Sequence, residues 1–304
     1  MNAPVAKLKV AILGTGNIGT DLLIKSLRSQ WLQPTLFVGR NLTSAGMVKA
    51  HSLGVPISDQ SINAIADKPG CCDLVFDATS AADAKRHAAI LRSLGKTVID
   101  LTPAKVGEMC VPAVNLGDCD DVPNINMVTC GGQASIPIAF LIGQTQSDVQ
   151  YVEVVSSIAS RSAGPATRRN IDEYVETTEK AIMRFTHANS VKAILILNPA
   201  EPCIDMQTTI FATVGSANLP ALREAVSAMV ANVKQYVPGY ELVVAPILEN
   251  GRIVVTVKVQ GLGDYLPKYA GNLDIINCAA IAAAEQIAKK RALQDPTQLK
   301  VAIS

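Results

Sequence analysis

The chain has 304 residues, which corresponds to roughly two domains of ordinary size. Hydrophobic residues make up 49% and charged residues 17%, a composition that fills a sizeable core and excludes a disordered chain. The 27 lysines and arginines nearly balance the 26 acidic residues, and the resulting net charge of +1 gives no basic field for nucleic acid or for an anionic membrane.

Short apolar runs alternate with helical patterns in the first half of the chain. The runs lie at residues 8–13, 35–38, 74–80, 97–100 and 125–128. Helical patterns at residues 17–29 and from 81 to about 94 separate them. Buried strands spaced by helices are typical of a parallel sheet that is covered on both faces. We therefore predict an α/β fold that begins with a doubly wound parallel sheet.

The pattern changes past residue 145. Strand patterns lie at residues 151–158, 193–197, 208–214, 241–248 and 253–259, with two amphipathic helices between them at residues 171–185 and 219–237. Asn250-Gly251 separates the last two strands and is a strong signal for a two-residue hairpin. We expect a largely antiparallel α+β domain with helices on one face. A final helix is expected from about 275 to 291.

The sequence contains seven cysteines and three histidines. The cysteine spacing is irregular and includes no C-x-x-C pair, so we expect neither a disulfide framework nor a metal site. No apolar run approaches the ~18 residues of a membrane span, and the run at residues 10–13 is too short for a signal peptide. These features predict a cytoplasmic protein with mostly reduced, buried thiols.

The first strand leads into a G-x-G-x-x-G motif at residues 14–19. Gly14 permits the tight turn, Gly16 lets a pyrophosphate approach the backbone, and Gly19 allows close packing of the helix on the sheet. The helix N-terminus then offers N–H groups and a partial positive charge to the phosphates. The motif therefore predicts a dinucleotide site, and the alternative is a glycine-rich turn that serves packing alone.

Arg40 stands where the ribose-binding acidic residue of such sites is expected. Its guanidinium could accept a 2′-phosphate, which would favour NADP over NAD. It could equally stack on adenine or be a solvated surface group. The sequence leaves these three interpretations open.

Cys130 has a setting that the other cysteines lack. It follows a strand pattern and precedes Gly131, Gly132 and an apolar stretch, which predicts a strand-to-helix junction. The helix dipole and nearby N–H groups lower the pKa of a thiol at such a place, and the two glycines leave room for a substrate and for oxyanion donors. We predict that Cys130 is a nucleophile, with a structural thiol as the alternative. No histidine can be paired with it from sequence: His87, for example, has no evident partner.

A loop rich in small residues is expected at residues 162–170. Asn170 and Glu173 have the spacing of an N-cap and a capping-box glutamate for the following helix. One interpretation is a loop beside a cofactor, with Arg168 and Arg169 available for an anionic group. The other is a plain connecting loop that ends in a helix cap.

Seven segments carry a family resemblance: residues 13–21, 76–80, 99–104, 126–134, 162–170, 198–202 and 269–275. They resemble, in the same order, the acylating acetaldehyde dehydrogenases of aromatic meta-cleavage pathways. The resemblance covers nearly the whole chain. Its most distinctive block is Asn-Met-Val-Thr-Cys-Gly-Gly-Gln-Ala, around Cys130.

This resemblance implies the reaction of acetaldehyde or propanal with NAD and CoA to give acyl-CoA and NADH, in the catabolism of aromatic compounds. The family's acyl-thioester cysteine falls on Cys130. The implied fold resembles the glyceraldehyde-phosphate and semialdehyde dehydrogenases, with a Rossmann domain at residues 1–131, completed by a C-terminal helix at 273–304, and a catalytic and dimerisation domain at 132–272. The family forms homodimers within a larger complex and receives its aldehyde from a 4-hydroxy-2-oxovalerate aldolase through an internal channel.

The family's cofactor-contacting segments fall on residues 15–18, residues 162–170 and Asn272. Together with the outer glycines of the motif and Arg40, they complete the candidate cofactor-binding set. The set is Gly14, Thr15, Gly16, Asn17, Ile18, Gly19, Arg40, Ser162, Ala163, Gly164, Pro165, Ala166, Thr167, Arg168, Arg169, Asn170 and Asn272.

Two positions depart from the family pattern. Gly39-Arg40 replaces the usual acidic end of the second strand, which leaves NAD against NADP open. Thr208 stands where the family usually has a carboxylate that helps to deprotonate the cysteine, so the base is not identified. The rival functions are a phosphorylating semialdehyde dehydrogenase and a non-catalytic NAD(P)-binding regulator.

Overall fold

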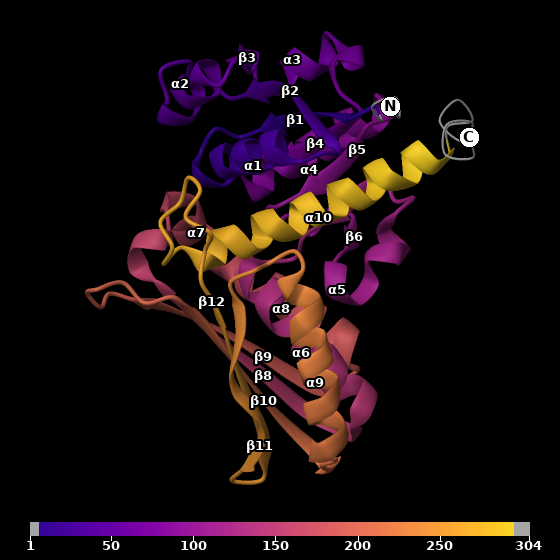
Figure 1. The fold of residues 1–304 in the computed structure, drawn as a ribbon, viewed down its shortest axis with the longest axis vertical. Helices are drawn as coiled ribbons and strands as arrows, with labels where there is room; N and C mark the ends of the chain where they lie inside the picture. The colour runs from indigo at the N-terminus through magenta and orange to yellow at the C-terminus, as the bar shows by residue number, and fades with distance from the viewer. Residues whose placement is uncertain (1–5, 295–304) are drawn as a thin grey trace, which may run out of the picture. The chain divides into compact units, whose positions relative to one another are not determined.

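The computed structural model describes residues 6–294, and the chain forms two compact units (Figure 1). Within the described chain, the first unit comprises residues 6–108, 116–126 and 280–294. The second comprises residues 109–115 and 127–279. The predicted domain boundary after residue 131 falls inside a helix that begins at Cys130, and that helix belongs to the second unit. Residues 295–304 of the predicted C-terminal helix lie outside the described residues.

The first unit is built on a parallel sheet. Its strands are β1 (Leu8–Leu13), β2 (Leu32–Val38), β3 (Ile57–Ser58), β4 (Leu74–Asp77), β5 (Thr97–Asp100), β6 (Glu108–Met109) and β7 (Asn124–Asn126). Their order is β3-β2-β1-β4-β5-β7-β6, and the successive pairs from β3 to β7 are parallel. The chain order reverses between β1 and β4, which is the place where doubly wound sheets bind their ligands. This confirms the predicted α/β class.

Short and medium helices connect these strands, and the last helix joins them. They are α1 (Asn17–Arg28), α2 (Ala45–Ser52), α3 (Asn63–Ala66), α4 (Ala81–Ser93), the 3₁₀ turns Pro69–Cys71 and Leu116–Cys119, and the part of α10 (Gly271–Gln294) after residue 279. Hydrogen bonds attach α10 within this unit: for example, the Ser29 hydroxyl donates to Glu285 over 2.6 Å, and Arg291 donates to Thr97 Oγ1 over 2.8 Å.

The second unit is built on a five-stranded sheet. Its strands are β8 (Ser147–Ala159), β9 (Ser190–Asn198), β10 (Met206–Ser216), β11 (Tyr240–Glu249) and β12 (Arg252–Val259), in the order β11-β12-β10-β8-β9. The pairs are antiparallel except for β8 with β9, which is parallel. The predicted hairpin is present: Asn250 and Gly251 have φ values of 49° and 76°, as a two-residue loop between twisted strands requires.

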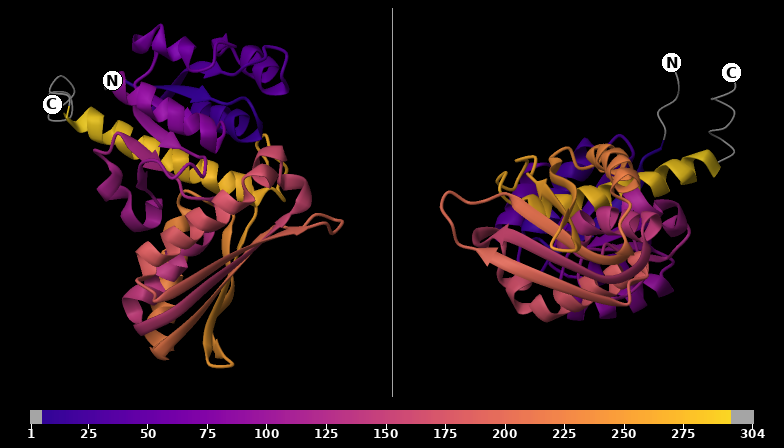
Figure 2. Two further views of the ribbon diagram at one scale, coloured as in Figure 1. Left: turned by 180° about the vertical axis from the view of Figure 1, so that it is seen from behind. Right: turned by 90° about the horizontal axis from the view of Figure 1, so that it is seen from below.

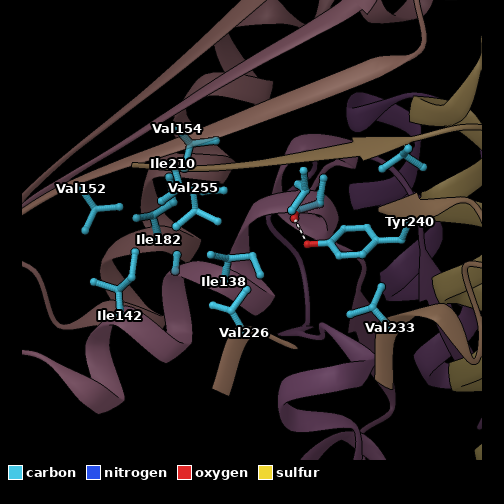
Figure 3. Packing of buried hydrophobic residues seen from close by; sticks show 14 of the residues in the cluster. Ile138, Ile142, Val152, Val154, Ile182, Ile210, Val226, Val233, Tyr240 and Val255 are labelled. Atoms are coloured by element: carbon cyan, nitrogen blue, oxygen red, sulfur yellow. Dashed lines mark hydrogen bonds between the residues drawn. The ribbon is translucent and has the colours of Figure 1, made fainter. Parts of the chain in front are cut away.

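Helices cover one face of this sheet. They are α6 (Cys130–Thr145), α8 (Ile171–Thr186) and α9 (Leu219–Lys234), and the short α5 (Pro112–Asn115) and α7 (Pro165–Arg169) complete the unit (Figures 1 and 2). Inward-facing side chains such as Ile138 on α6, Val154 on β8 and Ile210 on β10 form the buried core (Figure 3). The Tyr240 hydroxyl in this core donates to the Ala134 carbonyl over 2.8 Å. None of the described helices is long and apolar enough to cross a membrane.

Candidate functional site

The glycine motif forms a closed turn between β1 and α1. Gly14 has φ of +105°, and a Cβ there would lie 2.7 Å from the Ala78 carbonyl carbon at the end of β4. A Cβ at Gly19 would lie 2.9 Å from the Gly14 carbonyl carbon. By contrast, a Cβ at Gly16 would meet no heavy atom within 4 Å. Two glycines therefore close the turn, and the third presents bare backbone to open space.

This turn fits a dinucleotide pyrophosphate. Gly16 is the N-cap of α1 and supplies no side chain to cover the helix end, where Asn17 and Ile18 form the first turn. A helix N-terminus that is open in this way attracts phosphate through its N–H groups and its dipole. Thr15 lies in the same turn, with its hydroxyl 3.3 Å from that of Ser44. Arg40 is exposed two residues after β2, so its side chain can reach a bound ligand or solvent.

Cys130 is the first residue of α6, as the predicted strand-to-helix junction requires. Thr129 caps the helix: its Oγ1 accepts from the Gly132 N–H over 2.9 Å. The preceding Val128 has φ of 59°, a left-handed conformation that is unfavourable for a β-branched residue. Strained backbone of this kind is concentrated at functional sites, where the surrounding structure maintains it.

The Cys130 thiol has hydrogen-bond donors around it, but its pKa departs from the expected direction. The N–H groups of Gly131 and of Cys130 itself and the Tyr174 hydroxyl all lower the pKa. Burial acts more strongly in the opposite direction and raises the pKa to about 11. The prediction of a lowered pKa for Cys130 is therefore wrong for the protein without a bound ligand. The removal of solvent from around the sulfur raises the pKa by more than the hydrogen-bond donors lower it.

The two glycines after Cys130 do leave room, but protein side chains fill it. A Cβ at Gly131 would collide with the Tyr174 hydroxyl and lie 2.9 Å from Ser156 Oγ. A Cβ at Gly132 would lie 2.7 Å from a Val128 methyl group. The expectation that these glycines make space for a substrate is corrected: Gly131 lets α8 and β8 approach the cysteine, and Gly132 makes room for the Val128 side chain.

A row of hydroxyl groups leads away from Cys130. Tyr174 on α8 hydrogen-bonds to Cys130 and to Ser156 on β8. Ser156 Oγ lies 3.0 Å from Thr208 Oγ1 on β10. From the sequence, Thr208 stood out only as a departure from the family pattern. The spacing of Tyr174 placed it on the apolar face of a helix. The available signal was a serine at an inward position of a β-strand that otherwise presents valine and isoleucine there.

The contacts of Gln133, another residue of the distinctive block around Cys130, explain its role. It is buried, and its side-chain amide donates to the carbonyls of Cys110 and Met127 over 2.8 and 2.9 Å. These bonds fasten the first turn of α6 to two neighbouring segments of the chain. Gln133 therefore fixes the position of the cysteine rather than acting on a substrate.

The segment at residues 162–170, for which the sequence left two interpretations open, is not a plain connecting loop. It follows a 3₁₀ turn at Ser160–Ser162 and contains the short helix α7. Arg168 donates to the Ala163 carbonyl over 3.0 Å and to Ser160, so its guanidinium braces the segment itself. Arg169 is exposed. Asn170 is the N-cap residue of α8, as predicted, but its side chain makes no cap hydrogen bond, so the predicted capping-box bonding is absent.

Asn272, in the first turn of α10, carries an unusual polar atom. The residue is 1% exposed, and among the described residues its Oδ1 has no hydrogen-bond partner. An unsatisfied buried acceptor costs free energy, so its retention favours a role with a ligand that donates to it. A nicotinamide carboxamide has such a donor.

His87 does have a partner, contrary to the sequence expectation. Its Nδ1 lies 2.8 Å from Asp77 Oδ2, and both side chains are 1% exposed. Both belong to the first unit, whereas Cys130 belongs to the second. The pair organises the carboxyl end of β4, where Asp77 also accepts from the Thr79 N–H over 3.1 Å.

The candidate residues thus fall into two groups. The glycine motif and Arg40 lie in the first unit, and Cys130, residues 162–170 and Asn272 lie in the second. Within the second unit, Cys130 is brought together with Tyr174 and Ser156, which the sequence did not predict as site residues. The cysteines of the described chain are all free thiols, as expected.

Two family matches span most of the chain. Residues 9–119 match the family described as semialdehyde dehydrogenase, NAD binding domain, and this confirms an NAD-binding domain. Residues 130–267 match the family described as prokaryotic acetaldehyde dehydrogenase, dimerisation.

Curated relatives are similar over nearly the full length. An acetaldehyde dehydrogenase of Spirochaeta aurantia is 62% identical over 282 residues, which is 93% of this chain and 95% of the relative. An acetaldehyde dehydrogenase of Pectobacterium atrosepticum is 60% identical, over 94% and 97% of the two chains. One from Burkholderia thailandensis is 50% identical, over 92% and 94%.

A solved structure supports the fold. Aspartate semialdehyde dehydrogenase II of Vibrio cholerae superposes with a TM-score of 0.62 at 12% identity, covering 96% of this chain and 100% of that one. At this identity the similarity concerns the fold alone. It confirms the predicted semialdehyde-dehydrogenase type of architecture.

Proposed function

The chain belongs to the acetaldehyde dehydrogenase family, and we propose that it converts a short aldehyde, NAD+ and coenzyme A into acyl-CoA and NADH through a thioester on Cys130. The observation that carries this proposal is the setting of Cys130. A thiol at the capped N-terminus of α6, with hydrogen-bond donors converging on its sulfur, has the arrangement of a nucleophile.

The Cys130 thiolate attacks the carbonyl carbon of the aldehyde. A carbon–sulfur bond forms, and the carbonyl π electrons move to the oxygen to give a thiohemiacetal alkoxide. We assign the Gly131 N–H as a donor to this oxyanion, since it already points at the sulfur in the free chain. Thr129 and Gln133 hold the first turn of α6 in place while charge develops.

When bound, NAD+ supplies the hydride acceptor that turns the thiohemiacetal into a thioester. The bare backbone at Gly16 and the N-terminus of α1 would hold its pyrophosphate. Asn272, whose Oδ1 has no hydrogen-bond partner among the described residues, is a candidate for cofactor contact that the family resemblance also implies. Residues 162–170 remain further candidates for cofactor contact.

The thiolate of coenzyme A then attacks the thioester carbonyl, and the Cys130 thiolate leaves. The acyl group stays activated in this exchange, because the thioester to Cys130 is replaced by the thioester to coenzyme A. The rival phosphorylating reaction would use inorganic phosphate at this step and yield an acyl phosphate.

Arg40 bears on the choice of nucleotide. NAD is the cofactor we propose, and Arg40 gives NADP as the alternative. Replacing Arg40 by aspartate restores an acceptor for the ribose hydroxyls and repels a 2′-phosphate. We therefore expect R40D to lower the ratio of kcat/KM for NADP+ over NAD+ by about tenfold, the effect of one charged hydrogen bond.

The oligomeric state, the partner enzyme and the pathway that we propose rest on the resemblance to the family. We propose a homodimer that receives its aldehyde from a 4-hydroxy-2-oxovalerate aldolase in the breakdown of aromatic compounds. Co-expression with such an aldolase, followed by size-exclusion chromatography, tests whether the two chains elute together.

The test of the reaction is a steady-state assay with acetaldehyde and propanal, NAD+ or NADP+, and either CoA or phosphate. We expect NADH formation that requires CoA and is not supported by phosphate. C130A should lower kcat by about 10³-fold or more, as nucleophile removal does in other enzymes. C203A is the matched control, because Cys203 is also a half-buried free thiol of the second unit. Full activity of C130A would overturn the proposal.

A further inference from the structure

The base that the family is expected to place beside the cysteine is replaced here by a hydroxyl. Thr208 is fully buried on β10, at 0% exposure, and contacts Ser156 rather than a charged group. A threonine hydroxyl cannot take up a proton at neutral pH, so Thr208 cannot act as the missing base. The site must favour the thiolate of Cys130 in another way.

Counting the available protons gives one consistent set of donors and acceptors for these hydroxyl groups. A phenol has one proton to donate, and a serine or threonine hydroxyl also has one. The Tyr174 oxygen accepts from Ser156 in this set, and the phenol proton is then directed to Cys130. Ser156 Oγ lies 3.0 Å from Thr208 Oγ1, and either hydroxyl can donate in this contact; when Ser156 donates to Tyr174, Thr208 is the donor. In this set the row runs from Thr208 through Ser156 and Tyr174 to the sulfur.

A second set of hydrogen bonds fixes the backbone of Tyr174. Thr178, one turn further along α8, donates to the Tyr174 carbonyl over 2.7 Å. The Thr178 oxygen lies 2.8 Å from Thr129 Oγ1, the cap of α6. The residue before Cys130 is thus linked to the turn that carries Tyr174. This link keeps the phenol and the thiol in register although they come from different helices.

We propose that Tyr174 is a positioning residue that donates a hydrogen bond to the Cys130 thiolate, and that Ser156 and Thr208 orient its hydroxyl in place of a carboxylate. The inference rests on the proposed role of Cys130 as nucleophile. Tyr174 is 7% exposed and Ser156 is 1% exposed, so water does not compete for these bonds. The absence of a Cβ at Gly131 is what lets the phenol reach the sulfur.

The role of Tyr174 is to stabilise charge rather than to remove a proton. Burial raises the pKa of Tyr174 well above its usual value, so the phenol stays protonated and remains a donor. The groups that act on the pKa of Cys130 are its burial, the N–H groups of Gly131 and of Cys130, and the Tyr174 hydroxyl, with no carboxylate or ammonium group among them. Loss of the phenol therefore removes the one side-chain donor in this set.

The test measures the rate of Cys130 alkylation by iodoacetamide against pH, by mass spectrometry of the Cys130 peptide in the cofactor-free protein. Y174F is expected to move the midpoint upward by about one pH unit, and to slow alkylation about tenfold at pH 8, as loss of one hydrogen bond to a charged group implies. T208V should shift the midpoint in the same direction by less. In steady-state turnover, the kcat of Y174F should fall at pH 7 relative to the natural chain and recover in part at higher pH.

Tyr240 supplies the matched control. Its hydroxyl is also buried in the second unit and hydrogen-bonds to α6 through the Ala134 carbonyl, away from the cysteine. Y240F should leave the alkylation midpoint unchanged. An unchanged midpoint in both Y174F and T208V would overturn the proposal, as would an equal shift in Y240F. Alkylation does not depend on turnover, so failure of the thioester mechanism is recognised separately, by activity that persists in C130A.

Discussion

Asp77 and Asp100 occupy directly paired positions at the carboxyl ends of two neighbouring parallel strands, β4 and β5. Both are 1% exposed. Asp77 is paired with His87, whereas Asp100 accepts from the Thr102 N–H over 2.8 Å. Burial and the nearby charge of Asp77 raise the pKa of Asp100 to about 7. Asp100 therefore titrates near neutral pH in the folded chain.

The raised pKa of Asp100 predicts a pH-dependent stability. The pKa of Asp100 is higher in the folded chain than in the unfolded chain, so the folded state binds more protons between about pH 4 and pH 7. The free energy of unfolding therefore falls as pH rises through this window, by at most about 1.4 kcal/mol per pH unit for one group. D100N should make this slope shallower, so that the variant gains stability relative to the natural chain at pH 8 compared with pH 5. Urea unfolding at the two pH values measures it.

An exposed carboxylate of the same unit gives the control for this experiment. Asp59 lies at the surface, and D59N should leave the slope as it is. Parallel pH curves for D100N and the natural chain would contradict the prediction.

The strands and the nucleotide turn follow from local pattern. The apolar run at residues 8–13 and the glycines after it specify β1 and its turn without reference to the rest of the chain, and the run at residues 97–100 coincides with β5. Cys130 was found by the same logic, because a strand pattern, a cysteine and two glycines define a strand-to-helix junction. Local signals of this kind need no tertiary information.

The pKa of Cys130 and the hydrogen bonds around it could not be predicted from the local sequence pattern. The pKa of Cys130 depends on how much solvent the fold removes, and the hydroxyl row depends on Ser156 and Thr208, which are separated by 52 positions in the sequence. Tyr174 has the spacing of an apolar helix face, and its hydroxyl gains a role only when α8 packs against α6. The contact partners of His87 and Gly131 were likewise invisible because they lie on other elements.

Gly16 separates cofactor binding from folding. A methyl group at this position meets no protein atom within 4 Å, but it occupies the space beside the bare backbone of the turn. G16A should therefore raise the KM for NAD+ about tenfold, equivalent to about 1.4 kcal/mol, with the melting temperature little changed. G70A, at another glycine with nothing within 4 Å, should change neither value. An unaltered KM in G16A would mean that phosphate does not approach this turn.

Thr129 couples the start of α6 to α8. Its hydroxyl accepts from the Gly132 N–H over 2.9 Å and contacts Thr178 over 2.8 Å. T129A should lower the free energy of unfolding by about 1 kcal/mol, as the loss of an N-cap does. It should also slow Cys130 alkylation, because α6 and Tyr174 lose their link. T129S keeps the hydroxyl and is expected to behave like the natural chain in both measurements; equal losses in T129S and T129A would show that the methyl group matters instead.

Ile196 on β9 tests the proposed homodimer. It is 44% exposed and Ile194 is 37% exposed on the same strand, while the alternating residues Ala193 and Leu195 pack into the core that α6 and α8 cover. These two isoleucines leave apolar surface on the opposite face of the sheet, within the residues that match a dimerisation domain. A buried charge at such an interface is costly, so I196D should convert a dimer into a monomer in sedimentation at micromolar concentration. V48D, at a 59% exposed valine of the first unit, is the control and should leave the mass unchanged. A dimer that persists in I196D would place the interface on another surface.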